Sequence, residues 1–164
     1  MLEIGVGSGA SIKGWLGYFD QAMIVGVDIA KDTNPWNTPG NMVHPRYSFN
    51  QGNQSDPEFW KGFITDHGSD WDVVVDDGGH YADQVITSYT CLWPHIKTRG
   101  FYCIEDLGVS YPHLWEKYGD VFVKPPWPHH MDFLKGKLDE LNQGVGGIDS
   151  IYLARELAII KKSL

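Results

Sequence analysis

Basic residues and cysteines are scarce in this sequence. The 164-residue chain has 13 Lys and Arg against 21 Asp and Glu, for a net charge of −8, and no basic cluster offsets the acid. Nucleic acid is therefore not expected as a partner, because binding to a phosphate backbone depends on clustered positive charge. The two cysteines, Cys91 and Cys103, lie far apart without a metal-ligand spacing and are interpreted as reduced core thiols.

Long apolar runs and linker-like segments are also missing. No stretch of about 18 apolar residues occurs, and the first residues lack a basic region followed by an apolar run, so neither a membrane span nor a signal peptide is expected. These features predict a cytoplasmic protein. The length suits one domain, so residues 1–164 are expected to fold as a single unit.

The chain does contain short apolar runs that alternate with amphipathic segments. This pattern is typical of βαβ units and predicts an α/β fold with a Rossmann-like, mostly parallel sheet. Strands are expected at Leu2–Ile4, Met23–Val27, Tyr47–Phe49, Val73–Val75, Tyr102–Ile104, Ser150–Ala154 and Leu157–Lys161. Helices are expected at Ser11–Tyr18, Pro57–Asp66, Tyr81–Trp93 and Met131–Asn142. The last two strands are so close in sequence that they predict a C-terminal antiparallel hairpin at one edge of the sheet.

The stretch "LEIGVGSGAS" places Gly5, Gly7 and Gly9 between the first strand and the first helix. Glycines at such a turn let a ligand approach the backbone, but the GxGxG spacing differs from the GxGxxG of dinucleotide sites. Glu3 adds a carboxylate that would repel a phosphate, which favours a cationic ligand. Asp28 ends the next strand, where it could accept hydrogen bonds from a ribose diol. Together these features suit S-adenosylmethionine better than NAD.

Acidic residues end two further strands, in "VVVDDGGH" and "CIED". Because the carboxyl ends of parallel strands meet at one edge of a sheet, Asp76, Asp77, Glu105 and Asp106 are expected to converge there. Crowded carboxylates repel one another, and an all-oxygen ligand set favours Mg²⁺ over Zn²⁺. The alternative for the first motif is a turn that caps a helix, with His80 on the surface.

With these motifs in order, the chain resembles class I S-adenosylmethionine-dependent methyltransferases, and more narrowly the macrocin and mycinamicin type of sugar O-methyltransferases. The resemblance implies that Asp77, Glu105 and Asp106 bind Mg²⁺ and that His80 is the general base. It implies a cofactor site formed by Glu3, Gly5, Gly7, Ser8, Asp28, Asn53, Gln54 and Asp76. Relatives have a pattern resembling "GDQSD" where this chain reads "GNQSD", so Asn53 replaces a carboxylate.

The function implied is Mg²⁺-assisted transfer of a methyl group from S-adenosylmethionine to a hydroxyl of a small metabolite, such as a glycoside or a polyketide. The chain is N-terminally short by comparison with relatives, which implies an open cofactor cleft. An alternative is a non-catalytic or repurposed relative, such as a cofactor-binding subunit or an enzyme that rearranges a natural product. A nicotinamide-dependent oxidoreductase is disfavoured by the glycine spacing. The acceptor and any homo-oligomer are left open.

The segment from Leu107 to Pro128 fits neither helical nor strand periodicity and is rich in Pro, Gly and aromatic residues. Long loops of this kind in compact domains often carry function, so the segment is interpreted as a lid or a substrate wall. His129 and His130 follow it and are expected to be solvated rather than metal ligands.

Overall fold

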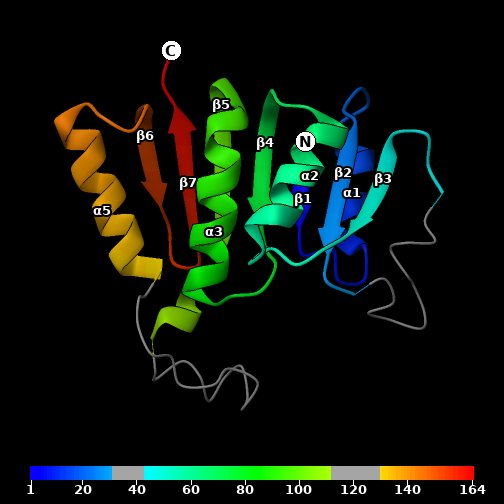
Figure 1. Cartoon of the computed structure of the whole chain (residues 1–164), viewed down its shortest axis with the longest axis horizontal. Coiled ribbons are helices and arrows are strands. Elements are labelled where there is room, and N and C mark those ends of the chain that lie inside the picture. Colours follow the sequence, from blue (N-terminus) through cyan, green and yellow to red (C-terminus); the bar gives the residue numbers. More distant parts are fainter. Residues whose placement is uncertain (31–42, 112–129) are drawn as a thin grey trace.

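The computed structural model describes residues 1–30, 43–111 and 130–164. They form one seven-stranded sheet in the order β3-β2-β1-β4-β5-β7-β6 (Figure 1). The strands are β1 (Leu2–Ile4), β2 (Ile24–Asp28), β3 (Tyr47–Gln51), β4 (Trp71–Asp76), β5 (Ile96–Glu105), β6 (Ile148–Leu153) and β7 (Leu157–Lys162). The helices are α1 (Ala10–Tyr18), α2 (Pro57–His67), α3 (Ala82–Leu92) and α5 (His130–Gln143), with 3-10 turns η2 (Trp93–His95) and η3 (Leu107–Ser110).

Strand directions confirm the predicted α/β fold with a mostly parallel sheet. Strands β1 to β5 pair in parallel, whereas β7 pairs antiparallel with both β5 and β6. The strand order reverses beside β1, between β2 and β4. In open α/β sheets, ligands bind beyond the carboxyl ends of the strands at such a reversal. The topology therefore places a binding crevice where the glycine turn and the acidic strand ends meet.

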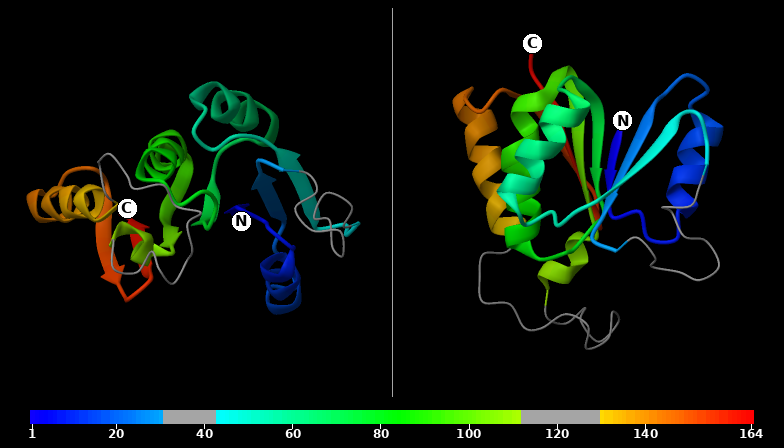
Figure 2. Two further views of the ribbon diagram at one scale, coloured as in Figure 1. Left: turned by 90° about the horizontal axis from the view of Figure 1, so that it is seen from below. Right: turned by 45° about the vertical axis from the view of Figure 1, so that its right-hand side comes forward.

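Helices cover the two faces of the sheet unequally (Figure 2). Helices α2, α3 and α5 lie on one face, where Trp60, Tyr89 and Leu134 pack into the larger apolar cluster. Helix α1 lies on the other face and contributes Ile12 to a smaller cluster with Tyr47. The bulk of the core thus lies under α2, α3 and α5, and this core anchors the strand ends that form the crevice.

Local signals explain the helix boundaries better than the strand boundaries. Helix α2 begins as expected, because the Asp56 side chain accepts a hydrogen bond from the Glu58 amide at 2.9 Å and Pro57 occupies the first turn. Strand β5 is longer than its predicted core, since it also includes the exposed polar run 97–99. Strand β4 pairs with β5 at Ile96 and again from Phe101, so the run lies at an irregularity in the pairing that apolar periodicity does not predict.

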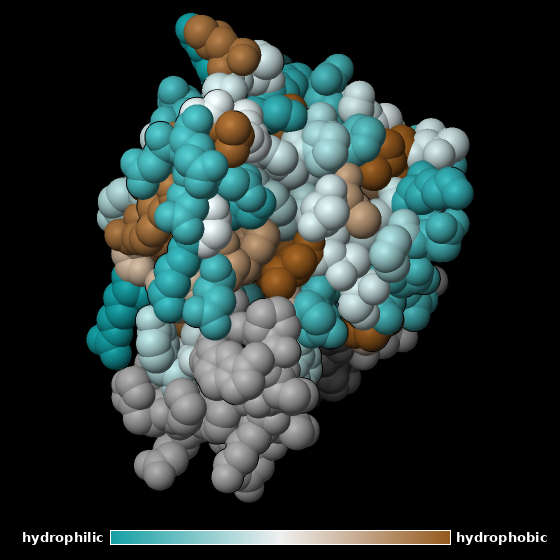
Figure 3. Space-filling view, turned by 60° about the vertical axis from the view of Figure 1, so that its left-hand side comes forward, coloured by the Kyte–Doolittle hydropathy of each residue, from teal (hydrophilic) through white to brown (hydrophobic). Residues whose placement is uncertain are grey.

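The surface on the α5 and β6 side is mainly hydrophilic, with apolar side chains in small separate groups (Figure 3). Tyr152 and Leu153 of β6 are among the exposed apolar residues of the described chain. Among the helices that the structure describes, none combines the length and apolar character that a membrane crossing requires.

The turns after β1 and β4 are packed directly against each other. The Asp77 amide donates to the Ile4 carbonyl oxygen at 2.9 Å, and the Gly5 amide donates to Val27 on the other side at 2.8 Å. Gly5 has a φ of +84°, and a Cβ added there would lie 2.0 Å from the Asp77 carbonyl oxygen. Gly7, at φ +51°, has open space around it. Of these two positions, only Gly5 requires a glycine both for its backbone conformation and for its close contact with Asp77.

Substituting these two glycines separately is expected to distinguish the two requirements. G7A should lower the free energy of unfolding by about 1–2 kcal/mol, the cost of a left-handed conformation for a residue with a side chain. G5A should lower it by about 2–5 kcal/mol, because a backbone carbonyl must also move. Chemical denaturation of both variants measures the difference, and equal losses would contradict the close contact between the two turns.

Candidate active site

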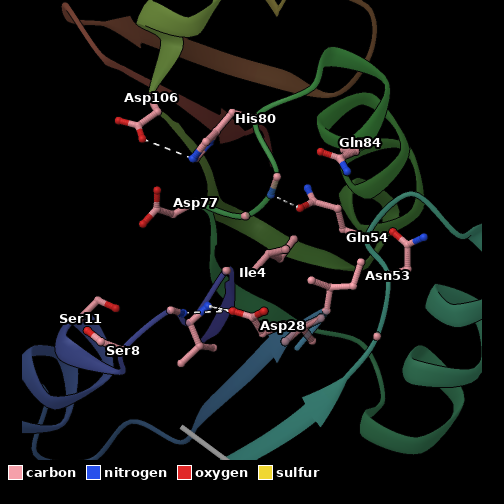
Figure 4. Close-up of a pocket in the computed structure, with 18 of the residues that line it drawn as sticks. Ile4, Ser8, Ser11, Asp28, Asn53, Gln54, Asp77, His80, Gln84 and Asp106 are labelled. Atoms are coloured by element: carbon pink, nitrogen blue, oxygen red, sulfur yellow. Dashed lines mark hydrogen bonds and ion pairs between the residues drawn. The ribbon is translucent and has the colours of Figure 1, made fainter. Parts of the chain in front are cut away.

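A cleft of about 620 Å³ lies at the carboxyl ends of the central strands (Figure 4). Its volume is typical of a site for a small molecule or cofactor. Nine residues predicted from the sequence line it: Gly5, Gly7, Ser8, Asp28, Asn53, Gln54, Asp77, His80 and Asp106. They come from the ends of β1, β2, β3, β4 and β5, so the topology brings together residues that lie up to 101 positions apart (106 − 5).

Asp28 joins the glycine turn to the end of β2. Its Oδ2 accepts hydrogen bonds from the amides of Val6 and Gly7, each at 3.0 Å, and its Oδ1 accepts from the Ala30 amide at 3.0 Å. A carboxylate has about four acceptor positions. Asp28 therefore orders the glycine turn and, at the wall of the cleft, retains capacity for a further donor such as a ribose hydroxyl.

Glu3 lies beneath the glycine turn and does not line the cleft. It is 1% exposed and accepts hydrogen bonds from the Ser11 hydroxyl and the Trp15 indole of α1. Burial raises the pKa of Glu3, and the two hydrogen bonds oppose this shift. Through these hydrogen bonds, Glu3 connects β1 to α1. A contact between Glu3 and a ligand stays a prediction.

Asp76 is likewise buried, with 2% of its surface exposed, and does not line the cleft. It accepts hydrogen bonds from Gln54 Nε2 at 3.0 Å, Tyr102 at 2.6 Å and Ser88. Gln54 Oε1 in turn accepts from the Gly79 amide at 2.6 Å. Burial raises the pKa of Asp76, and its three side-chain donors lower it again. Gln54 thus connects the buried carboxyl to the turn that carries His80.

Asn53 is occupied within its own turn. Its Oδ1 accepts hydrogen bonds from the Ser55 amide at 3.0 Å and from the Ser55 hydroxyl at 2.7 Å. Such a side-chain turn orders the segment between β3 and α2. Asn53 also lines the cleft, and its contact with a cofactor stays a prediction.

Asp77, His80 and Asp106 form a group at one end of the cleft. One potential ligand atom from each lies within 4.8 Å of the other two, and all three residues are half-buried. His80 Nε2 lies 3.3 Å from Asp106 Oδ2 (Figure 4). Glu105 lies outside this group and outside the lining of the cleft. Of the four residues assigned to metal binding and base catalysis, the structure therefore brings three together directly.

Burial and, after it, repulsion between carboxylates disfavour the ionised carboxyl groups at this end of the cleft. Burial, followed by the charges of Glu105 and Asp106, raises the pKa of Asp77 to about 7. Burial also raises the pKa of Glu105, as does Asp106, while His80 opposes that shift. Glu105 therefore acts on the group through its charge even though it is not part of it.

The residues present fit a divalent metal ion. The carboxylates of Asp77 and Asp106 lie close enough to share one ion, with the His80 imidazole beside them, and the open cleft leaves positions for water or an acceptor. A doubly charged cation would also offset the burial and the repulsion that raise the pKa of Asp77. An oxygen-rich donor set of this kind suits Mg²⁺.

Ten other lining residues were not assigned to the site from the sequence, and two of them have polar side chains. Gln84 and Ser11 both belong to first turns of helices that follow the key motifs. Gln84 Oε1 accepts a hydrogen bond from the Tyr81 amide at 3.3 Å in a capping box. The spacing of Tyr81 and Gln84 signals a helix start, but nothing in it shows that Gln84 faces a cleft.

The expected lid is partly corrected by the structure. The first residues of that segment form η3, whose four residues are all buried, so they belong to the core rather than to a mobile lid. Residues 112–129, which comprise the rest of that segment and His129, lie outside the described residues. His130, expected to be solvated, is 4% exposed, and its Nδ1 lies 3.1 Å from the Ser110 hydroxyl.

Curated proteins similar to this chain are O-methyltransferases. No protein-family model matches the chain. The chain is 32% identical over 169 aligned positions to L-olivosyl-oleandolide 3-O-methyltransferase of Streptomyces antibioticus, covering 96% of this chain and 41% of that protein. It is 33% identical over 126 positions to mycinamicin VI 2''-O-methyltransferase of Micromonospora griseorubida, covering 73% and 29% respectively.

A solved structure agrees over the whole chain. The MycE methyltransferase of the mycinamycin pathway, in complex with Mg, SAH and mycinamycin VI, superposes with a TM-score of 0.81 at 28% identity. The match covers 99% of this chain and 44% of MycE. The chain has the fold of the class I S-adenosylmethionine-dependent methyltransferases and belongs to that class. Within the class it is close to the macrocin- and mycinamicin-type sugar O-methyltransferases, and it spans less than half the length of those it matches.

The buried position of Glu3 has a measurable consequence for stability. Because its pKa is raised, the folded protein holds this proton to higher pH than the unfolded chain does. The contribution of Glu3 to stability is complete below the ordinary pKa of 4.5 and is lost as pH rises through the folded value. The variant E3Q has no such loss, so its free energy of unfolding should improve relative to wild type as pH rises above about 4.5.

Denaturation curves of both proteins between pH 4 and 8 check this. A constant offset of about 1 kcal/mol against E3Q is also expected, because Gln cannot accept both hydrogen bonds of Glu3 equally well. D139N, which alters an exposed carboxylate on α5, is the control and should differ from wild type by a nearly constant amount. A difference between E3Q and wild type that does not change with pH would contradict the assignment.

Proposed function

We propose that this chain carries the methyl-transfer site of an S-adenosylmethionine-dependent, Mg²⁺-assisted O-methyltransferase. The observation that carries the proposal is the group of Asp77, His80 and Asp106 at one end of a cleft that begins at a glycine turn. The cleft has room for a cofactor, and the group lies where an acceptor hydroxyl would meet it. The curated relatives are O-methyltransferases, and three of their names specify a glycosylated acceptor, an olivosyl-oleandolide or a rhamnosyl-tetracenomycin. A sugar hydroxyl on such a metabolite is therefore the acceptor we propose.

The two ends of the cleft would have separate tasks. The glycine turn, ordered by Asp28, would hold the methyl donor, and Asp28 would also accept from its ribose. Asp77 and Asp106, supported by the charge of Glu105, would bind the metal ion. Bound there, Mg²⁺ would lower the pKa of an acceptor hydroxyl and place it towards the donor.

His80 is the residue we propose for proton removal. An aliphatic hydroxyl is too weak an acid to ionise unaided at neutral pH, so its proton must pass to a base within hydrogen-bond reach. Nε2 of His80 would accept the hydroxyl proton. Asp106 Oδ2, 3.3 Å away, would then stabilise the imidazolium that forms. The remaining barrier is largely positional, because the acceptor oxygen must approach the methyl carbon in line with the departing sulfur.

Calorimetric titration with S-adenosylhomocysteine, S-adenosylmethionine and NAD tests the donor end of the cleft. We expect micromolar binding of the first two and no measurable binding of NAD, since the glycine spacing and Asp28 suit a ligand without a pyrophosphate. G7A is the matched variant and should weaken S-adenosylhomocysteine without affecting Mg²⁺. Binding of NAD alone, or of none of the three, would reject the proposed donor.

Two substitutions separate metal binding from proton transfer. D77N should abolish measurable Mg²⁺ binding while leaving the affinity for S-adenosylhomocysteine within about tenfold, because Asp77 touches only one end of the cleft. H80A should retain Mg²⁺ binding and reduce turnover by about 100-fold or more. Mg²⁺ titration and release of S-adenosylhomocysteine in the presence of a panel of polyketide glycosides provide the two readings.

The converse results have distinct meanings. Loss of Mg²⁺ binding in H80A would make His80 a metal ligand rather than the base. Full turnover in H80A would remove it from the chemistry altogether. E105Q completes the set: a loss of Mg²⁺ affinity similar to that in D77N would show that Glu105 binds the ion directly.

A further inference from the structure

Asp106 is held in an unusual backbone conformation. Its φ of +54° and ψ of 39° lie in the left-handed region, which residues other than Gly adopt infrequently. Asp106 is also the residue that precedes η3, so the direction of its side chain depends on where that short helix is held. Such conformations persist where the surrounding structure fixes them, and they gather at functional sites.

The tip of the β6–β7 hairpin holds the first turn of η3. Glu156 lies in this tip, directly before β7. Its Oε2 accepts a hydrogen bond from the Gly108 amide at 2.6 Å, and its carbonyl oxygen accepts from the Leu107 amide at 3.4 Å. The two residues that follow Asp106 are thus both bonded to one residue 50 positions later in the sequence (156 − 106).

The Glu156 carboxylate packs closely against Gly108 of η3. A Cβ added to Gly108 would lie 2.4 Å from Glu156 Oε2, so the carboxylate is packed against the η3 backbone. At its other end, η3 is held by α5 through the Ser110 hydroxyl and His130 Nδ1, 3.1 Å apart and both buried. The helix is therefore fixed from both sides, and the end nearer to Asp106 depends on Glu156.

We propose that Glu156 is a positioning residue for the metal site: it fixes η3 and thereby aims the Asp106 carboxylate at Asp77 and His80. This inference rests on the proposed function, because it assigns Asp106 to the site of a divalent cation. It gives the antiparallel hairpin a role in the chemistry at the end of β5. Partners that support metal ligands commonly change metal affinity by 10- to 100-fold when they are removed.

Titration of the whole chain with MgCl₂, in the presence of saturating S-adenosylhomocysteine, tests the proposal. E156A should weaken Mg²⁺ binding by about 10- to 100-fold. The affinity for S-adenosylhomocysteine, measured separately, should stay within about threefold. E156Q should restore Mg²⁺ binding to near the wild-type value, because a Gln Oε1 can still accept from the Gly108 amide. E58A, which removes an exposed carboxylate on α2, is the matched control and should bind Mg²⁺ as wild type does.

G108A gives an independent reading if E156A does not fold. Gly108 does not have a positive φ, so Ala is compatible with its backbone, but the new methyl group would displace the Glu156 carboxylate. G108A should therefore also weaken Mg²⁺ more than S-adenosylhomocysteine.

Failures at different levels are distinguishable. If the wild-type chain binds no Mg²⁺, the metal part of the proposed function fails and the role of Glu156 fails with it. If wild type binds Mg²⁺ and both E156A and G108A bind it equally well, only the role of Glu156 is overturned. An equal loss of Mg²⁺ and S-adenosylhomocysteine affinity, or no recovery in E156Q, would also overturn it, because either result indicates a general structural defect.

Discussion

The pairing of β1 with both β2 and β4 is the constraint on which the cleft depends. Ile4 lies opposite Val27 on one side and Asp76 on the other, so three strands end at the same level. The Asp77 amide then donates to the Ile4 carbonyl oxygen, and Gly5 passes so close to Asp77 that no side chain fits between them. The glycine turn and the acidic turn can therefore hold their positions only together.

Acidic residues at these strand ends divide into two kinds according to burial. Glu3 and Asp76 are almost inaccessible, and their hydrogen bonds join α1, α3 and the turn after β3 to the sheet. Asp77 and Asp106 are half-buried and face the cleft, where burial, followed by repulsion from neighbouring carboxylates, raises the pKa of Asp77 to about 7. The first kind supports the architecture, and the second provides the charge that a divalent cation would neutralise.

The hairpin at the end of the chain supports the cleft as well as the edge of the sheet. Strand β7 runs antiparallel against β5, so its first residues lie beside the end of β5, where Glu105 pairs with Leu157. The tip that precedes β7 thereby reaches η3. The hairpin therefore completes the edge of the sheet and also lies next to the residues of the candidate metal site.

Much of the fold could be predicted from local pattern. The positions of the seven strands and four helices that the structure describes follow from apolar periodicity, and Asp56 and Pro57 mark the start of α2. Periodicity could not predict the full length of β5, because its exposed polar run lies at an irregularity in the pairing with β4 and has no apolar alternation. The burial of η3 and His130 was also missed, since a segment rich in Pro, Gly and aromatic residues has no period that distinguishes a core turn from a loop.

The sequence by itself determined the order of the motifs, and hence which residue types collect at one edge of a parallel sheet: glycines after β1 and acids after β2, β4 and β5. Only the tertiary structure decided which of those acids face the cleft. Glu3 and Asp76 are bonded inside the protein, Asp77 and Asp106 meet His80, and Glu105 lies outside that group. The physical reason is that chain order sets where a strand ends, whereas side-chain direction and burial depend on packing between segments far apart in sequence.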